Sequence, residues 1–583
     1  MDFKIENHYH DVLIIGSGGS GLSAAIFAAG DRSCDVAVIS KVHPLKSHTI
    51  AAQGGINASL GNVSKDDWRW HAYDTIKSSA WIADQDSVEE MCRRAPEIIY
   101  LLDQLGVEFD RNAAGKIDQK IYGGQSTDFG KGGFAHRACY SKDKTGNTIM
   151  HRLYDEAIKQ NVQFYNYNFA LDLLVQNDKC YGVICLDMEL GILRIIKSGN
   201  VIIASGGYSQ IFATATSSLV CTGDGNGLAT RAGIPLQDME FVQFHPTALS
   251  EIGVLITEAS RSAGGRLLNK QGVQFMEEYA PKFKELAPRD VVARAIANEI
   301  VNGRGCGPSG NYVYLDLTHM SAEKIKETLP TVYENCKSFI SLDPSKDLIP
   351  IAPAAHYTMG GVPTNNKCQV IRFRSGIEIE VEGLYAIGEA ACISVHGAGR
   401  LGCNSLLDLL VFAKKATESM KKIDNKNLKF DEAAIALQRM DNIFRGDVGN
   451  VESITKSLKN IMSRYVGVFR VEDGLETALQ QIRQIKNEFN TITISDKSLS
   501  WNLELQHYLE LENMITSAIA TVKAAIWRKE SRGAHWRDDY KDEDNKFLGH
   551  SIVSSENDDK VLLRPVRKSK DNVDFYQPQG RNY

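Results

Sequence analysis

The stretch from Asp11 to Gly30, DVLIIGSGGSGLSAAIFAAG, decides the fold. Its first part, DVLII, is a short apolar run of the kind that forms a buried strand, and GSGGSG at residues 16–21 leads from it into a helix of small residues. This is the G-x-G-x-x-G pattern in the strand, turn and helix context that dinucleotide binding requires. The first glycine permits the tight turn, the second lets the backbone approach a pyrophosphate, and the third lets helix and strand pack closely. We therefore predict a dinucleotide-binding domain at the start of the chain.

Later strands extend this domain and favour one dinucleotide. Asp35 to Ile39 (DVAVI) is followed by Ser40 and Lys41 instead of the acidic residue that binds the ribose of NAD, which leaves FAD open. Two more buried strands, VIIASGG at residues 201–207 and GLYAIGEAA at residues 383–391, bring small residues and a glutamate to the carboxyl end of the sheet. Doubly wound sheets bind their ligands at that end. The order of these motifs predicts a split FAD domain.

The composition is that of a large globular protein. At 583 residues the chain has room for roughly three to four domains, and 43% hydrophobic with 24% charged residues excludes disorder as its main state. The net charge of −6 gives no basic field for a nucleic-acid backbone, so we expect no nucleic-acid partner. The eleven cysteines contain no C-x-x-C pair, so their spacing builds neither an iron-sulfur nor a zinc site, and we expect no metal. No apolar run approaches the roughly 18 residues that span a bilayer, and the N-terminal residues fit neither a signal peptide nor a transit peptide.

A family resemblance rests on SHTIAAQGGINA at residues 47–58. This segment resembles the flavin-attachment loop of the flavoprotein subunits of succinate dehydrogenase and fumarate reductase, in which the histidine of S-H-T carries FAD covalently through the 8α carbon. His48 matches that histidine. Nine further segments follow in the order of the family: WRWHAYDTIK (68–77), YGGQSTDFGKGGFAHR (122–137), CTGDGNG (221–227), FVQFHPT (241–247), LITEASR (255–261), PRDVVAR (288–294), HYTMGGVPTN (356–365), HGAGRLGCNSLLDL (396–409) and SRGAHWRDDY (531–540).

The motifs and the resemblance together predict an α/β fold with a defined domain order. A two-dinucleotide-binding, Rossmann-like FAD domain (1–243 and 356–412) is split by an α+β capping domain (244–355). A helical bundle domain (413–530) and a C-terminal segment (531–583) follow. In the helical part, apolar residues from Leu505 to Ile526 recur at three- to four-residue spacing, which predicts a helix with one buried stripe.

The resemblance implies oxidation of succinate to fumarate. A buried dianion needs fixed donors, because carboxylates that lose water without gaining partners cost several kcal/mol each. By resemblance, His356 and Arg400 hold one carboxylate, and His245 and Thr257 hold the other. Arg289 matches the proton-transferring arginine of the family.

Two further residues resemble the rest of the proton relay. Glu258 and Arg261 are three residues apart, which on a helical turn places them on one face. The resemblance implies a relay in which Arg289 passes the proton to Glu258. From there the proton moves through Arg261 toward solvent.

The cofactor contacts are also carried over by resemblance. The linkage through His48 is expected to raise the flavin potential enough for electrons to be accepted from a saturated diacid. The other expected contacts with FAD are Gly16, Gly18 and Gly21 at the pyrophosphate, Ser40, Lys41 and Ala204 toward the adenosine end, Asp224 and Glu389 beside the ribityl chain, Ser405 and Leu406 beside the ring, and Gly54 and Gly55 in the attachment loop.

Partners follow from the need for electrons to leave. The resemblance implies an iron-sulfur subunit and, beyond it, membrane anchor subunits with quinone and haem b. We therefore expect a peripheral protein on the cytoplasmic face of a bacterial inner membrane. The alternative is the matrix side of a mitochondrial membrane, and the lack of a transit-peptide pattern disfavours this alternative.

Three alternatives remain beside succinate oxidation. Quinol-linked fumarate reduction would apply if the partners run electrons the other way, although the segment at 122–137 leans toward the dehydrogenases. L-Aspartate oxidases resemble the family without the covalent link, so His48 argues against them. A noncatalytic flavin-binding subunit would be expected to lack Arg289, Arg400 or His245, and all three are present.

Three positions depart from the pattern of the family. Gly399 stands where Asn is common, Cys403 where Ala is common, and Lys541 where Pro is common. These changes affect loop stiffness and packing and leave the charged groups in place. They bear on the fine geometry of substrate binding and leave the reaction class unchanged.

Overall fold

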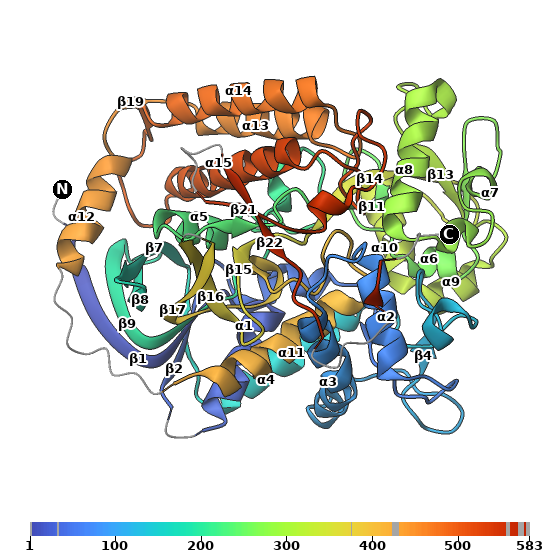
Figure 1. Cartoon of the computed structure of the whole chain (residues 1–583), viewed down its shortest axis with the longest axis horizontal. Coiled ribbons are helices and arrows are strands. Elements are labelled where there is room, and N and C mark those ends of the chain that lie inside the picture. The colour runs from blue at the N-terminus through green and yellow to red at the C-terminus, as the bar shows by residue number, and fades with distance from the viewer. Residues whose placement is uncertain are drawn as a thin grey trace.

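A large mixed sheet forms the centre of the protein. The structure, a computed structural model, describes residues 3–31, 34–374, 376–421, 431–554, 560–569 and 576–578. The eight-stranded sheet has the order β16-β17-β8-β9-β1-β2-β6, with β7 paired to β8 (Figure 1). Its strands are β1 (Ile5–Ile15), β2 (Val36–Ser40), β6 (Gln163–Asn166), β7 (Asn168–Gln176), β8 (Lys179–Asp187), β9 (Ile192–Ile203), β16 (Gln369–Arg374) and β17 (Ile377–Ala386).

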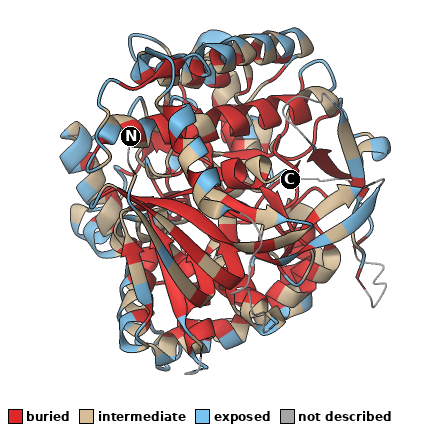
Figure 2. Ribbon diagram, turned by 90° about the vertical axis from the view of Figure 1, so that its left-hand side faces the viewer, coloured by how far each residue is buried: buried red, intermediate tan, exposed pale blue. Residues whose placement is uncertain are grey.

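The parallel part of this sheet gathers the predicted nucleotide motifs. β1 lies between β2 and β9, and β17 runs parallel to β9, so all four strands end at the same edge. The side chains of β2 are all buried, and Figure 2 shows the strands of the sheet as a largely buried layer. The strand predicted over 201–207 ends earlier, at Ile203, and the one predicted over 383–391 ends at Ala386, so the small residues form the loops beyond the strands.

Helices pack beside the parallel strands. α1 (Gly19–Ala29) follows β1 directly and contacts both α4 (Thr145–Lys159) and α11 (Asn404–Ser419). Figure 1 shows these three helices together. The same part of the chain contains α2 (Trp68–Ser78), α3 (Gln85–Gln104), α5 (Asp224–Arg231), the short sheet of β3 (Ile56–Asn57), β5 (Ala138–Cys139) and β4 (Gln119–Lys120), and the pair β15 (Val362–Pro363) and β18 (Ala391–Cys392).

A second unit is inserted between β9 and β15. Its four-stranded antiparallel sheet has the order β11-β14-β13-β12. The elements are β11 (Val242–Leu249), α6 (Ala259–Ser262), β12 (Arg266–Leu268), α7 (Met276–Tyr279), α8 (Arg289–Glu299), β13 (Val313–Asp316), α9 (Ala322–Thr328), α10 (Pro330–Ile340) and β14 (Ile349–Thr358). The expected domain limits at 243/244 and 355/356 fall inside β11 and β14, which pair with each other. These two strands therefore connect the inserted unit to the rest of the chain.

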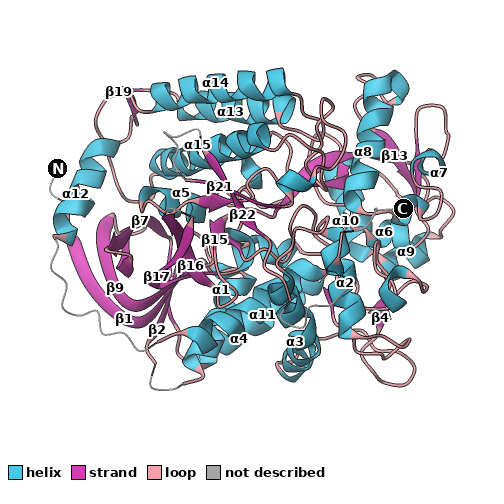
Figure 3. Ribbon diagram, viewed as in Figure 1, coloured by secondary structure: helices cyan, strands magenta, loops and turns pink. Residues whose placement is uncertain are grey.

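The helical part lies above the large sheet in the view of Figure 1. It contains α12 (Glu432–Ile443), α13 (Val451–Tyr465), α14 (Glu472–Phe489), α15 (Leu503–Trp527) and the short pair β19 (Asp447–Val448) and β20 (Ile492–Thr493). Figure 3 shows α13 and α14 as the outer layer with α15 beneath them. None of the helices in the described ranges has the length and apolar character that a bilayer span needs.

The helix α15 differs from its sequence prediction. We predicted a single apolar stripe, but polar residues away from that stripe, such as Asn513, Ser517 and Lys523, are buried as well. The reason is that α15 contacts α13 and α14 as well as α5 and β21 (Gly549–Val553). Packing on several sides buries the polar positions that a surface helix would expose.

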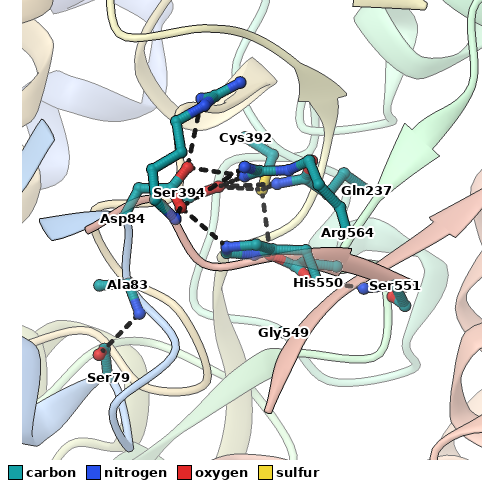
Figure 4. A network of polar contacts seen from close by, with 12 residues as sticks. Ser79, Ala83, Asp84, Gln237, Cys392, Ser394, Gly549, His550, Ser551 and Arg564 are labelled. Atoms are coloured by element: carbon teal, nitrogen blue, oxygen red, sulfur yellow. Dashed lines mark hydrogen bonds and ion pairs between the residues drawn. The ribbon is translucent and has the colours of Figure 1, made fainter. Parts of the chain in front are cut away.

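The C-terminal segment is joined to the FAD-binding part by a buried ionic network. β21 (Gly549–Val553) pairs with β22 (Val561–Pro565) and with β10 (Leu236–Gln237). His550 on β21 lies between two carboxylates, with Nδ1 2.6 Å from Asp238 and Nε2 3.2 Å from Asp84, and Arg564 donates to Asp84 at 2.7 Å (Figure 4). Burial alone would lower the pKa of His550, but the two carboxylates raise it above its usual value.

Replacing His550 by Ala should destabilise this junction. The change leaves Asp238 buried without its cation, which costs about 3 kcal/mol. Because the folded-state pKa of His550 lies above the unfolded value of 6.5, its contribution is full below that pH and is lost as the pH rises through the folded-state pKa. Denaturant unfolding should therefore show a larger difference from wild type near pH 6 than near pH 9. His507→Ala, at an exposed position, is the control, and equal midpoints for wild type and His550→Ala would contradict the prediction.

Candidate functional site

One cavity lies at the carboxyl ends of the parallel strands. It measures about 1510 Å³ with its part open to solvent included, and we call it the main cavity. It is lined by Ile15 and Gly16 at the end of β1, by Ser40 and Lys41 at the end of β2, and by Ala204 after β9. Its other end reaches the start of α11 and the inserted unit. Its position is the one expected for a ligand of a doubly wound sheet.

The glycine turn leaves room for a phosphate group at the start of α1. Gly16 has φ +108°, and a Cβ there would lie 2.3 Å from the carbonyl oxygen of Ala204. A Cβ on Gly21 would lie 1.9 Å from the carbonyl oxygen of Gly16. Gly16, Gly18 and Ser20 line the main cavity, whereas Gly21 does not. Gly21 therefore serves the close packing of helix and strand, and the backbone before it faces the ligand.

The helical part supports the nucleotide end of the main cavity. Lys41 Nζ lies 2.9 Å from the Asp224 carboxylate and 2.7 Å from that of Glu510 on α15. Asp224 Oδ1 also accepts from Asn513 of α15 at 3.0 Å. Burial would lower the pKa of Lys41, but the two carboxylates raise it above its usual value. Lys41 is therefore held in its charged form at a fixed position. Nothing in the sequence indicated that Glu510 and Asn513 take part in this contact.

His48 presents one ring nitrogen to the main cavity. It begins a short 3-10 turn after Ser47, and its Nδ1 accepts from the backbone N–H of Ser218 at 3.2 Å. Since Nδ1 is engaged, Nε2 is the nitrogen available to a ligand. Burial, and then the charge of Arg400, lowers the pKa of His48 to about 4. The imidazole is thus neutral at neutral pH, with its proton on Nε2, and a bond formed at Nε2 would replace that proton while Nδ1 keeps the N–H of Ser218.

Two arginines meet beside the same cavity. Arg289, the first residue of α8, and Arg400 both donate to Gln243 Oε1, at 3.4 Å and 3.1 Å. Arg400 also lies over the ring of Tyr357, with its guanidinium carbon 4.5 Å from the ring centroid. Burial, and then the charge of Arg289, lowers the pKa of Arg400 to about 10. A buried cation and a half-buried one that share a neutral acceptor form a strong site for an anion.

Two histidines complete this end of the cavity. The ring centroids of His245 and His356 are 4.9 Å apart. His245 Nδ1 accepts from the N–H of Thr247 at 3.2 Å, so its Nε2 carries the proton in the neutral ring. Burial, followed by nearby charges, lowers the pKa of both histidines well below the usual value. Both rings are therefore neutral hydrogen-bonding groups.

The expected relay residues lie together. Glu258 Oε2 accepts from Arg289 Nε at 2.8 Å, and Glu258 Oε1 accepts from the N–H of Gly123 at 2.9 Å. Burial would raise the pKa of Glu258, but the charges of Arg289 and Arg261 lower it below its usual value. Arg261 lies on the next helical turn, with Nη2 3.7 Å from Glu258 Oε2, and it donates to the carbonyl of Glu285. Its side chain is fully buried and lines neither this cavity nor the second one described below.

The structure brings nearly all of the predicted site residues to one cavity. Of the residues assigned from the sequence, only Gly21 and Arg261 do not line it. Those that do are Gly16, Gly18, Ser40, Lys41, His48, Gly54, Gly55, Ala204, Asp224, His245, Thr257, Glu258, Arg289, His356, Glu389, Arg400, Ser405 and Leu406.

Some residues of the site were missed by sequence reasoning. Gln243, which links the two arginines from outside the main cavity, precedes the predicted His245 by two positions on β11, so strand periodicity could have indicated it. Tyr122, Gln53 and Phe169 line the main cavity. Of the positions that depart from the family pattern, Cys403 lines it, and burial raises the pKa of its thiol to about 12.

The donor set suits an FAD and offers no metal centre. The glycine turn and the start of α1 can receive a pyrophosphate. Lys41 and Asp224 line the same cavity, and so do Ser405 and Leu406 in the first turn of α11. Burial raises the pKa of Glu389, beside the same cavity, to about 7. Within the described ranges, no three His, Cys, Asp or Glu side chains are grouped as they would be around a metal ion.

Comparison with known proteins gives matches along the whole chain. A family model described as an FAD binding domain matches residues 11–406, and one described as the fumarate reductase flavoprotein C-terminal region matches residues 455–583. The succinate dehydrogenase flavoprotein subunit of Rickettsia bellii is 45% identical over 100% of this chain and 99% of its own length. The mitochondrial succinate dehydrogenase [ubiquinone] flavoprotein subunit of Oryza sativa is 44% identical over 100% of this chain and 94% of its own.

A solved structure agrees with these matches. A variant of the E. coli quinol fumarate reductase has a TM-score of 0.90 and 32% identity, and the match covers 97% of this chain and 98% of that one. The similarity thus includes the FAD-binding part, the inserted unit and the helical part.

Proposed function

The chain belongs to the succinate dehydrogenase and fumarate reductase flavoprotein family, an FAD-dependent oxidoreductase family, and we propose that it oxidises succinate to fumarate in the main cavity. The observation that carries the proposal is the pair of guanidinium groups of Arg289 and Arg400 on Gln243. Glu258 offsets the charge of Arg289, and a dicarboxylate supplies the negative charge that Arg400 lacks. The greater identity to dehydrogenases than to reductases favours the oxidative direction.

The cofactor is FAD, and we propose that it is bound covalently to His48. The accessible Nε2 and the lowered pKa of His48 support an attachment at this nitrogen. When bound, FAD supplies the acceptor for the hydride that is removed from succinate. Gly16, Gly18 and Lys41 would hold its nucleotide end.

The side chains of the site divide the remaining work. Arg400 and His356 hold one carboxylate of succinate, and His245 and Thr257 hold the other. Because both imidazoles are neutral, they orient the dianion by donating hydrogen bonds and do not compete with the arginines for its charge.

The second hydrogen leaves succinate as a proton. Arg289 is a cation at rest, so it gives a proton to Glu258, whose Oε2 accepts from Arg289 Nε at 2.8 Å, and takes the proton of succinate in its place. Glu258 is the only carboxylate bonded to Arg289 among the described residues. Arg261, 3.7 Å from Glu258, continues the relay or stabilises its charge.

Electrons need a path out of this chain. We propose an iron-sulfur subunit as the first partner, followed by membrane anchor subunits with quinone and haem b, since the relatives are named as subunits of succinate dehydrogenases and quinol-linked reductases. The chain would then be peripheral to the cytoplasmic face of a bacterial membrane, or to the matrix face of a mitochondrial one.

Anaerobic titration of the flavin tests the proposed function. Added succinate should bleach the flavin absorbance, and malonate should compete, because it also carries two carboxylates for the two anion-holding sets. Butyrate, which has the same carbon chain length as succinate and only one carboxylate, should leave the absorbance unchanged at the same concentration. A flavin that dithionite bleaches and succinate does not would refute succinate oxidation. With the purified complex, the rates of succinate oxidation by quinone and of fumarate reduction by quinol decide the direction.

A further inference from the structure

A second cavity adjoins the two arginines from another side. It measures about 760 Å³ with its part open to solvent included, and we call it the outer cavity. It shares Glu258, Arg289 and Arg400 with the main cavity, so the two spaces meet at the proposed reaction centre. Its other walls come from the end of α2 (74–78), the loop 123–130, the segment 282–290 of the inserted unit and the loop 399–402.

We propose that the outer cavity is the route by which the dicarboxylate reaches Arg289 and Arg400, and that Lys282 at its mouth draws the dianion in. The proposal rests on the proposed function, under which the main cavity is the site of the flavin. The substrate must then approach the arginines from a side that the flavin does not fill, and the outer cavity provides such a side.

The charges of the outer cavity favour an anion. Its carboxylates each have a basic partner: Asp74 pairs with Arg137 at 2.8 Å, Asp290 with Arg294 at 3.1 Å, and Glu258 with Arg289 at 2.8 Å. Two lysines line the cavity in addition, Lys77 from α2 and Lys282 from the inserted unit. Lys282 is exposed to solvent, and its Nζ lies 5.2 Å from the ring centroid of Phe283.

Buried polar atoms without partners show what kind of ligand the outer cavity suits. Gln125 is 1% exposed and Arg400 is 3% exposed. Within the part of the chain that the structure describes, Gln125 Oε1 and Arg400 Nε have no hydrogen-bond partner, and both residues line the outer cavity. Buried polar groups of this kind are met by water or by a polar ligand. Arg400 Nε can donate to a carboxylate, and Gln125 Oε1 can accept from water that accompanies it, whereas an apolar molecule would leave both atoms unpaired.

The outer cavity lies between two parts of the chain. Phe283, from the inserted unit, contacts Phe134, which follows the loop 123–130, with ring centroids 5.9 Å apart in an edge-to-face arrangement. Phe134 is 39% exposed, so the pair stands near the surface. Lys77 lies in one of these parts and Lys282 in the other. A dianion between them would thus be attracted by both parts of the chain.

Charge reversal at Lys282 tests the proposal. In the purified holoenzyme with its copurifying subunits, Lys282→Glu should slow the association of malonate roughly 3- to 10-fold at low ionic strength. The effect is modest because a single exposed charge acts on the dianion through water, and dissolved salt screens it beyond the Debye length. The difference from wild type should shrink as salt is added, and kcat for succinate should stay unchanged, since Lys282 does not touch the reaction centre. Stopped-flow recording of the malonate-induced change in flavin absorbance gives the rate constants.

Lys284→Glu is the matched control. Lys284 is two residues away and is also exposed, but it pairs with Glu277 and lines neither cavity. The association rate in this variant should stay within about 2-fold of wild type. Equal effects of the two reversals, or no effect of Lys282→Glu, would overturn the route. A wild-type flavin that succinate fails to bleach would instead refute the proposed function, so the two failures are distinguishable.

Discussion

Replacing Arg289 by Ala should reduce kcat/KM for succinate oxidation by at least about 1000-fold while the flavin remains bound. Arg289 stands where the two cavities meet and is bonded to both Glu258 and Gln243. Its removal takes away the acceptor of the substrate proton, a group that contributes about 10²- to 10⁴-fold in enzymes generally. It also removes one of the two cations from the anion site. The binding free energy of succinate then loses one charged hydrogen bond, which contributes about 1.5–3 kcal/mol.

The loss should appear mainly in kcat. Arg400 and the two histidines remain to hold succinate, so the variant still binds dicarboxylate, but no group takes the proton. Arg289→Lys keeps the charge and loses the planar fork that donates to two acceptors at once. It should therefore restore affinity for malonate more than it restores turnover.

Steady-state kinetics, flavin content and malonate affinity should be measured together. Arg294→Ala is the matched control, because Arg294 lies on the same helix and bonds to Asp290 and to the carbonyl of Gly533 without lining either cavity. This variant should keep its turnover within a few fold. Substantial turnover in Arg289→Ala would remove Arg289 from its proposed role.

The sequence predicts those parts of the protein that local chemistry specifies. The turn at Gly16 could be predicted because only glycine fits its φ of +108° beside the carbonyl of Ala204. The nucleotide end of the cavity follows from this turn and from strands that end at the same edge of the sheet. The catalytic end depends more on the resemblance, since the spacing of His245, Arg289 and Arg400 along the chain carries no geometric information.

The parts that escaped prediction depend on contacts between distant segments. Gln243 is an uncharged residue that looks like part of a strand, and its position between two arginines appears only when β11, α8 and the loop before α11 come together. Similarly, Asp84 and Arg564 are 480 residues apart, and no local pattern pairs them. The buried polar residues of α15 were missed because periodicity reports one buried face and cannot report packing on several sides.

Replacing His48 by Ala should leave FAD bound but allow acid to release it. The nucleotide contacts at Gly16, Gly18 and Lys41 are unchanged in this variant, so the purified protein should stay yellow. In the wild type, acid precipitation should leave the flavin with the protein, because a carbon–nitrogen bond to Nε2 survives unfolding. His43→Ala is the control, because His43 is five residues away, outside the main cavity, and its Nδ1 accepts from the N–H of Leu45. Flavin that stays attached to His48→Ala would end the proposed linkage.

The two directions of the reaction should respond differently to this substitution. If the attachment raises the flavin potential, its loss makes electron transfer from succinate less favourable, and each fall of about 30 mV costs a factor of ten in the equilibrium of a two-electron step. Succinate oxidation should therefore fall by 100-fold or more, while fumarate reduction by a strong reductant should fall much less. A merely structural loss at His48 would lower the rates of succinate oxidation and fumarate reduction together. The ratio of these two rates therefore separates a damaged site from a lowered flavin potential, and a redox titration measures that potential directly.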